Sequence, residues 1–298
     1  MHRGRFAQHA LPMDVEIAEE RILVLTDRFG AHEAEGRAWP MRLQAFGTMA
    51  KMAGLLARPK DDEFEVTYRE KRLQPFWRLA SHATCVYERG RDYPITLAPE
   101  VQRVAIDGQD RPIAAHKVTL HGYESCREET RRQVLVDGLT GEEDPTLAAY
   151  LDFAAAPADA EHLAQLNADK VVVVPPQVRA SGLVREAVAK SIGAIEADKV
   201  LEETVRLEAV DLYYRPVYAF RFRRGSKEAV VEFDALTGAL STTGSTFEQH
   251  LGKVLEPKFL LDIGAEAANV FIPGATVVKL AIVKGLELSE KRKGAKTP

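Results

Sequence analysis

The chain has very little cysteine. Only two of its 298 residues are cysteines, Cys85 and Cys126. Two cysteines cannot build the disulfide framework that stabilises small secreted domains. Because 46% of the residues are apolar, the chain can instead fold around an ordinary hydrophobic core. The sequence therefore predicts a globular protein of a reducing, cytoplasmic compartment.

Long uncharged apolar runs are also missing. The first 20 residues carry cationic side chains but no apolar stretch of the length that a signal peptide needs. The most apolar region, residues 259–288, is interrupted by Asp262, Glu266, Lys279 and Lys284. Charges at this density argue against a membrane-spanning helix. We expect no membrane span, and at most a peripheral contact between the basic tail and an anionic membrane surface.

The chain lacks an excess of positive charge and the common catalytic motifs. A net charge of −4 excludes the uniformly basic make-up of a general nucleic-acid binder, although it leaves room for a local basic patch. Neither glycine-rich phosphate-binding pattern occurs, and no G-x-S-x-G turn presents a nucleophile. No cofactor is predicted, and a catalytic role is uncertain and less favoured than a binding role.

What the chain does have is two regions of alternating polar and apolar residues. In the first, alternation places Trp77, Leu79, Ser81, Ala83, Cys85 and Tyr87 on one side of a strand. In the second, Tyr214, Pro216, Tyr218, Phe220 and Phe222 share a face. Between them, residues 124–132 read as a helical or merely charged stretch, and residues 181–193 read as a capped amphipathic helix.

These patterns predict an α+β fold with two helix-plus-antiparallel-sheet units and flanking amphipathic helices. The expected order is an N-terminal helical arm, a first unit, an acidic Ala-rich connector, a second unit, and a C-terminal helical arm with a basic tail. The corresponding ranges are 1–60, 61–150, 151–170, 171–248 and 249–298. Within the last range, helices are expected at about 257–269 and 276–290.

Two strand ends are alike. Residues 135–141 read LVDGLTG and residues 232–238 read EFDALTG. In such a turn the Asp accepts backbone hydrogen bonds, the Thr hydroxyl supports the loop, and the Gly takes a positive φ. The predicted structural turn residues are Asp137, Thr140, Gly141, Asp234, Thr237 and Gly238. Duplication of one unit, represented by residues 64–141 and 183–240, is the favoured explanation, and chance similarity between two hairpins is the alternative.

The second unit resembles the PepSY family. The helix LVREAVAKSIG, the aromatic strand after it, and the final strand ending VVEFDALTG carry the resemblance, over about residues 181–242. The resemblance implies a helix packed on a small antiparallel sheet and a non-catalytic module. Members are often attached to secreted peptidases or membrane proteins, a setting from which this chain departs.

Two clusters of residues suggest other functions. His82, Cys85, His121 and Cys126 offer the nitrogen and sulfur ligands that zinc accepts, which would make a zinc-dependent enzyme. However, His82 and Cys85 are expected on opposite faces of a strand, and their spacing matches no standard zinc motif. Arg215, Arg221, Arg223 and Arg224 lie among aromatic residues, a combination that binds single-stranded nucleic acid or anionic surfaces. A solvated outer face of an amphipathic strand is the structural alternative for these arginines.

The sequence therefore favours a non-catalytic, cytoplasmic protein that acts in binding or assembly through protein–protein contacts, including self-association. Nucleic-acid or anionic-surface binding through residues 215–224 is the first alternative, and a zinc-dependent enzyme is the second.

Overall fold

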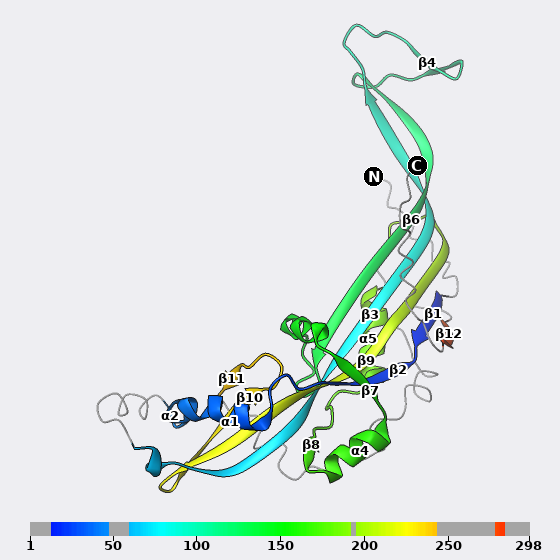
Figure 1. Cartoon of the computed structure of the whole chain (residues 1–298). Coiled ribbons are helices and arrows are strands. Elements are labelled where there is room, and N and C mark those ends of the chain that lie inside the picture. The colour runs from blue at the N-terminus through cyan, green and yellow to red at the C-terminus, as the bar shows by residue number, and fades with distance from the viewer. Residues whose placement is uncertain (1–12, 48–59, 192–194, 243–277, 284–298) are drawn as a thin grey trace, which may run out of the picture.

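The computed structural model describes residues 13–47, 60–191, 195–242 and 278–283. They form a long curved sheet with short helices around its lower half (Figure 1). The strands are β1 (Met13–Ala18), β2 (Glu20–Leu25), β3 (Glu65–Thr96), β4 (Val104–Ile106), β5 (Gln109–Arg111), β6 (Lys117–Asp137), β7 (Ala155–Ala158), β8 (Val171–Val173), β9 (Lys199–Arg224), β10 (Lys227–Asp234), β11 (Leu240–Ser241) and β12 (Val278–Val283). The α-helices are α1 (Ala31–Ala38), α2 (Arg42–Ala45), α4 (Ala160–Ala168) and α5 (Ala180–Ser191), and the 3-10 helices are η1 (Trp39–Met41), η2 (Asp61–Glu63) and η3 (Pro145–Asp152).

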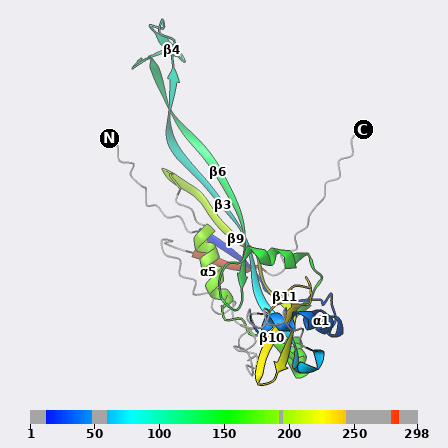
Figure 2. The same cartoon turned by 90° about the vertical axis from the view of Figure 1, so that its left-hand side faces the viewer.

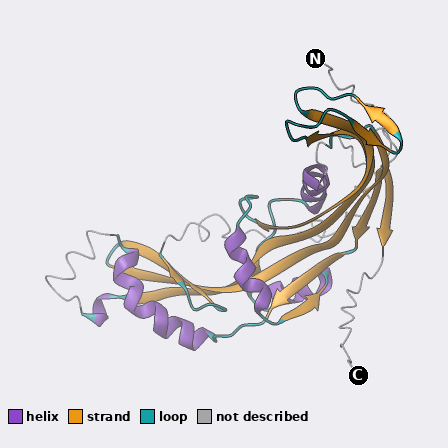
Figure 3. Cartoon of the chain, turned by 90° about the horizontal axis from the view of Figure 1, so that it is seen from above, coloured by secondary structure: helices purple, strands orange, loops and turns teal. Residues whose placement is uncertain are grey.

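A ten-stranded mixed sheet is the framework of the molecule. Its centre is the antiparallel pair of the two longest strands, β3 and β9. On the outer side of β3, β6 pairs antiparallel from Asp137 to Lys117. On the outer side of β9, β10 pairs antiparallel, while β1 and β2 pair parallel further along the same strand. The strands bend together, so that the sheet is strongly curved when seen from above (Figure 3).

The predicted α+β fold of two helix-plus-sheet units with flanking helices is wrong. β3 and β9, each expected in a different unit, pair with one another over most of their length. Inter-strand hydrogen bonds therefore run without a break across what was predicted to be a domain boundary, and the structure is predominantly one sheet.

The segments outside the two predicted units also contribute strands. Residues 13–25 lie in the predicted N-terminal helical arm, although the pattern of residues 14–26 fits a short strand as well as a helix, and they form β1 and β2, which extend the sheet. The predicted acidic connector contains β7, which pairs with β2, as well as α4. Residues 278–283, expected to be helical, form β12, which pairs in parallel with β1. The helix expected at 257–269 lies outside the described residues.

Alternation along the strands decides where the core forms. One face of the sheet, which we call the helix-side face, carries Trp77, Leu79, Leu212 and Tyr214, and these pack with Val184 and other residues of α5. Further along β9 the same face carries Phe220 and Phe222, which pack with Ala34 and Ala38 of α1. On the opposite face Phe76 and Tyr213 stack, with ring centroids 5.1 Å apart, and Leu147 of η3 covers them. The middle of the sheet is thus buried on both faces.

Several contacts near the middle of β3 and β9 occur twice. The carbonyl of Pro75 accepts a hydrogen bond from Gly138 N at 3.0 Å, and the carbonyl of Pro216 accepts one from Ala235 N, also at 3.0 Å. Both donors follow the Asp of a D-x-L-T-G turn. Gln74 of β3 and Arg215 of β9, which immediately precede Pro75 and Pro216, lie directly opposite each other in the strand pair.

The short strands that pair in parallel with β3 and β9, and the β-bulges of these two strands, also occur at corresponding positions. Val173 of β8 lies beside Leu73 of β3, and Val24 of β2 lies beside Tyr214 of β9. The β3–β9 register shifts between Val66 and Tyr68 on β3, and again where Ala80 and Ser81 face Ala209 and Leu207 on β9. The matching series are therefore β2–α1–β3–β6 and β8–α5–β9–β10, in the same chain order. These contacts support the internal repeat, which stays a prediction, but within one shared sheet.

No helix among the described residues is both long enough and apolar enough to cross a membrane.

Candidate functional site

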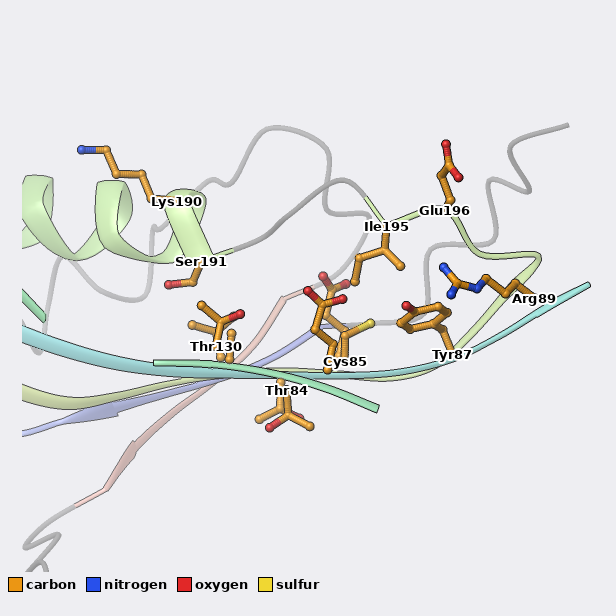
Figure 4. A pocket seen from close by; sticks show the side chains of 14 residues that line it. Thr84, Cys85, Tyr87, Arg89, Thr130, Lys190, Ser191, Ile195 and Glu196 are labelled. Atoms are coloured by element: carbon orange, nitrogen blue, oxygen red, sulfur yellow. The ribbon is translucent and has the colours of Figure 1, made fainter. Parts of the chain in front are cut away.

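A pocket lies on the helix-side face, beneath the C-terminal end of α5. Its volume is about 380 Å³. Side chains of β3, including Cys85 and Tyr87, rise from the sheet towards Ser191 and Ile195, which lie above them (Figure 4). The pocket is also lined by Ala83, Thr84, Arg89, Glu128, Thr130, Lys190, Glu196, Glu203, Thr204 and Val205. Its volume falls within the range of sites that hold small organic ligands, about 300–1,000 Å³.

One row of side chains crosses the floor of this pocket. Cys85 of β3 lies directly opposite Glu128 of β6 on one side and Glu203 of β9 on the other. Directly opposite residues point to the same face of a sheet, so a thiol lies between two carboxyl groups. Burial, followed by the negative charges of Glu203, Glu128 and Glu202, raises the pKa of Cys85 to about 11. Burial also raises the pKa of Glu203. The thiol is therefore protonated at neutral pH and is a poor nucleophile.

The positive side chains at the pocket already have partners. Lys190 Nζ contacts Glu143 Oε1 at 2.6 Å and Glu186 Oε1 at 2.7 Å. Arg89 Nε donates to Glu124 Oε2 at 2.6 Å, on the side of the pocket away from α5. These cations are thus neutralised by carboxylates that do not line the pocket.

The predicted zinc ligands do not come together. Cys85 is on the helix-side face, whereas His82 is on the opposite face, 3.6 Å from Glu129 Oε2. Cys126 lies opposite Tyr87, one row along from Cys85, and both cysteines are free thiols. His121 lies far along the hairpin, where it contacts Asp92. Among the described residues no group of three or more such side chains is placed to hold a metal ion.

The predicted anion-binding arginines are spread along β9 and have acidic partners. Arg223 and Arg224 contact Glu65 and Glu63, at 2.5 Å and 2.7 Å. Arg221 lies 3.6 Å from Glu228. These contacts reduce the positive charge that the strand presents to a nucleic acid or an anionic surface.

Arg215 is not at an open surface with the other three. Its guanidinium donates to Gln74 Oε1 at 2.9 Å, to Tyr150 Oη at 2.7 Å and to Asp234 Oδ2 at 3.2 Å. Arg215 thus joins the two central strands to η3 and to the second D-x-L-T-G turn. These contacts favour a structural role for Arg215, and nucleic-acid binding through residues 215–224 stays a prediction.

The two D-x-L-T-G turns have the same hydrogen bonds. Asp137 Oδ1 accepts from Leu139 N at 2.7 Å and from Thr140 N at 3.0 Å. Asp234 Oδ1 accepts from the equivalent amides of Leu236 and Thr237, at 2.9 Å and 2.8 Å. Each Thr hydroxyl accepts from the amide two residues on at 3.2 Å, and Gly141 and Gly238 have φ values of +79° and +77°. These carboxylates are used by the turns themselves.

A second candidate site is the end of the long hairpin. The last residue of β3 that pairs with β9 is Glu88, opposite Lys199. Beyond it, residues 89–96 of β3 and 117–124 of β6 form a two-stranded ribbon, which we call the outer ribbon. It extends well past the end of β9 in both side views (Figures 1 and 2). The connection between its strands carries the small hairpin β4–β5.

The outer ribbon exposes large apolar side chains. Five such side chains are exposed among the described residues, and three of them are on the ribbon: Tyr93 (42% exposed), Ile95 (43%) and Tyr123 (88%). The other two are Tyr68 and Leu201. Tyr93 and Ile95 share one face of the ribbon, whereas Tyr123, directly opposite Gly90, lies on the other face. Exposed apolar side chains gathered at one projecting end are typical of a contact site for another protein.

The charged groups of the outer ribbon are largely paired within it. Glu124 accepts hydrogen bonds from Arg89 Nε and from Tyr93 Oη, both at 2.6 Å. On the other face His121 contacts Asp92. The ribbon therefore presents apolar rings between charges that already have partners.

Sequence reasoning missed both candidate sites. The pocket needs Glu128 and Glu203 beside Cys85, and these three residues are brought together only by strand pairing. For the ribbon a signal was present: Tyr93, Ile95 and Tyr123 lie in alternating segments on either side of a region rich in turn residues. Reading that pattern as a long hairpin would have predicted a projecting arm.

Comparisons with known proteins give no further guide to the site. A scan against protein-family models, a search of curated proteins and a search of solved structures each found no match to this chain. The resemblance to PepSY domains therefore stays a prediction.

Proposed function

We propose that the chain is a non-catalytic, cytoplasmic assembly protein that acts through protein–protein contacts made by the outer ribbon. The observation that carries the proposal is the group of exposed apolar residues Tyr93, Ile95 and Tyr123 on a ribbon that leaves the body of the sheet. The free thiols Cys85 and Cys126 are compatible with the reducing compartment that the proposal includes.

A two-stranded ribbon needs additional packing to be stable. An isolated pair of strands is marginally stable at best in water, because its faces bury little apolar surface. Beyond Glu88 the described part of β3 pairs with β6 alone. A partner that covered Tyr93 and Ile95 would bury apolar area that water now contacts, at roughly 25 cal/mol for each Å².

The partner we assign to the ribbon is a second copy of this chain. The polar contacts of the ribbon, Arg89 with Glu124 and His121 with Asp92, are made within one molecule. A surface whose charges are already paired can meet its own copy across a two-fold axis without bringing like charges together. A strongly acidic or basic partner would gain little from such a surface.

The test is the oligomeric state of the purified full-length chain, measured by light scattering over a wide concentration range. We expect the wild-type chain to associate as its concentration rises. The combined change Tyr93→Ser, Ile95→Ser and Tyr123→Ser should leave it monomeric, because it removes the large exposed apolar side chains from both faces of the ribbon. Leu201→Ser is the matched control, since it removes an exposed apolar side chain from another place.

Two results would overturn the proposal. A wild-type chain that stays monomeric at the highest attainable concentration contradicts self-association. A triple variant that associates as strongly as the wild type assigns the contact to another surface. Circular dichroism of both variants shows whether the fold is retained.

A further inference from the structure

We propose that the pocket beneath α5 binds a small organic cation, an amine or amidinium group attached to a compact apolar body. This inference is independent of the outer ribbon and of self-association. It depends on three features of the pocket: its apolar surfaces, its carboxyl groups, and the pairing of its two described cations, Lys190 and Arg89, with carboxylates outside it.

Apolar side chains of the pocket can pack against the apolar part of the ligand. Ala83 of β3 lies directly opposite Val205 of β9, so these two side chains form one part of the floor. The ring of Tyr87 forms another part, and Ile195 faces them from above (Figure 4). A body of the size of one aromatic ring fits a volume of about 380 Å³ and would displace water from these surfaces.

The charged part of the ligand is defined by the carboxyl groups. Glu128 and Glu203 lie on either side of Cys85 in the floor, and Glu196 lines the pocket from above. Within the described part of the chain, none of these three glutamates makes an ion pair or a side-chain hydrogen bond. Each one keeps its capacity to accept hydrogen bonds from a ligand.

The surroundings strengthen this preference for positive charge. Lys190 and Arg89 are paired with carboxylates outside the pocket, and so they do not neutralise the floor. The C-terminal end of α5, which carries the negative end of the helix dipole, lies over the pocket at Ser191. Burial raises the pKa of Glu203, because it disfavours the ionised carboxylate. A bound ammonium would stabilise that ionised form.

The donor set favours an organic cation over a metal ion. Metal sites need three or more ligand atoms around one point, and the described residues contain no such group. Glu128 and Glu203 are instead separated by the thiol of Cys85. An ammonium or amidinium group carries several donors and can reach two separated acceptors, with its apolar body resting on Ala83 and Val205.

The experiment compares three probes of one size and different charge: phenethylammonium, 2-phenylethanol and phenylacetate. Each is titrated into the full-length chain at neutral pH by calorimetry, and methyl NMR signals of Ile195 and Val205 report the place of binding. We expect phenethylammonium to bind saturably, at least about ten-fold more tightly than phenylacetate, and to move both methyl signals, because a hydrogen bond to a charged group is stronger than one between neutral groups.

Variants test the role of each carboxyl group. Glu203→Gln and Glu128→Gln keep the shape of the side chain and should each weaken phenethylammonium binding by about ten-fold. Glu161→Gln, an exposed residue at the start of α4, is the matched control and should bind as the wild type does.

Three outcomes would overturn the inference. They are equal binding of the cation and the anion, methyl shifts confined to residues outside the pocket, and unchanged affinity in folded Glu203→Gln and Glu128→Gln variants. If either variant fails to fold, the comparison of the three probes on the wild-type chain decides the question alone.

Discussion

Glu20 is a carboxylate in a position where ionisation is costly. It begins β2, pairs with Val210 of β9, and lies close enough to the fully buried Tyr214 to affect that residue's pKa. Burial raises the pKa of Glu20 to about 7. Among the described residues, the hydroxyl of Tyr214 has no hydrogen-bond partner. A costly carboxylate on β2 therefore lies near an unsatisfied hydroxyl on β9.

This position predicts a pH-dependent stability. A carboxyl group whose pKa is higher in the folded chain than in the unfolded chain stabilises the fold below the unfolded pKa of 4.5 and loses that contribution as the pH rises towards about 7. Each pKa unit corresponds to about 1.4 kcal/mol, so the cost of ionisation reaches at most about 3 kcal/mol at pH 8. Glu20→Gln should therefore raise the free energy of unfolding at pH 8 by about 1–3 kcal/mol, with a much smaller effect near pH 4.

Chemical denaturation at both pH values measures the effect. The neighbouring Glu19 is exposed, so Glu19→Gln should change little at either pH and serves as the control. An equal effect of Glu20→Gln at pH 4 and pH 8 would contradict the assignment of the cost to ionisation.

At the scale of elements, the two D-x-L-T-G turns differ in what their aspartates hold. Among the described residues, the side chain of Asp137 accepts hydrogen bonds only within its own turn, from Leu139 and Thr140. Asp234 is 8% exposed and, besides its own turn, accepts hydrogen bonds from Tyr150 and Arg215. The second turn therefore fixes η3 against the sheet, which the first does not.

We expect Asp234→Ala to destabilise the chain more than Asp137→Ala. Loss of the turn hydrogen bonds costs each variant about 1–2 kcal/mol, and Asp234→Ala also removes the acceptor of the partly buried Tyr150 hydroxyl and one of the acceptors of Arg215, for about 1–3 kcal/mol more. Thermal or denaturant unfolding of both variants measures the difference. The asparagine variants keep the Oδ1 acceptor and should recover most of the turn contribution at each site. Equal losses at the two positions would show that the contacts with η3 contribute little.

β6 shows how pairing overrides local preference. Residues 124–132 contain several Glu and Arg residues, which favour a helix in isolation, yet they lie within a strand that pairs with β3 throughout. Their charged side chains are mostly exposed along the edge of the sheet. Charges on an edge strand oppose pairing with other chains, so the same residues that suggested a helix also protect the sheet from aggregation.

At the scale of the whole molecule, the sheet has a double-sided core and a single projecting end. Trp77, Leu79 and Leu212 are at most 3% exposed, whereas residues 90–96 of the outer ribbon are exposed throughout. Stability in such a structure is not uniform, because the ribbon can open without disturbing the core.

Hydrogen exchange of the backbone amides should show this gradient. At low protein concentration we expect the paired amides of the outer ribbon to exchange at least about 100-fold faster than the paired amides around Trp77 and Leu212. Mass spectrometry of peptides from both regions provides the measurement. Uniform protection along β3 and β6 would mean that the ribbon shares the stability of the core. Protection of the ribbon that grows with concentration would accompany the proposed self-association.

The matching halves of the molecule are interlocked. β2 comes before β3 in the chain but pairs with β9, and β8 comes before β9 but pairs with β3. Each half therefore contributes a short strand, β2 or β8, that pairs in parallel with the central strand of the other half. Neither half contains a complete sheet by itself, which is the physical reason that two separate units do not form.

The sequence by itself determined the local features of this protein. Alternation placed Trp77, Leu79, Cys85 and Tyr87 on one buried face, because successive side chains of a strand point in opposite directions. The apolar spacing from residue 181 onwards marked the helix α5. Such features depend on a few neighbouring residues, and a single chain contains the information for them.

Only the tertiary structure decided which strands meet. The pairing of β3 with β9, the parallel addition of β1, β2 and β12, and the placement of Glu128 and Glu203 beside Cys85 all join residues far apart in the chain. Many alternative pairings of these strands would satisfy the same alternation. The choice among them comes from the apolar surface that the whole sheet buries against α1, α5 and η3, and that choice also created the pocket and left the outer ribbon exposed.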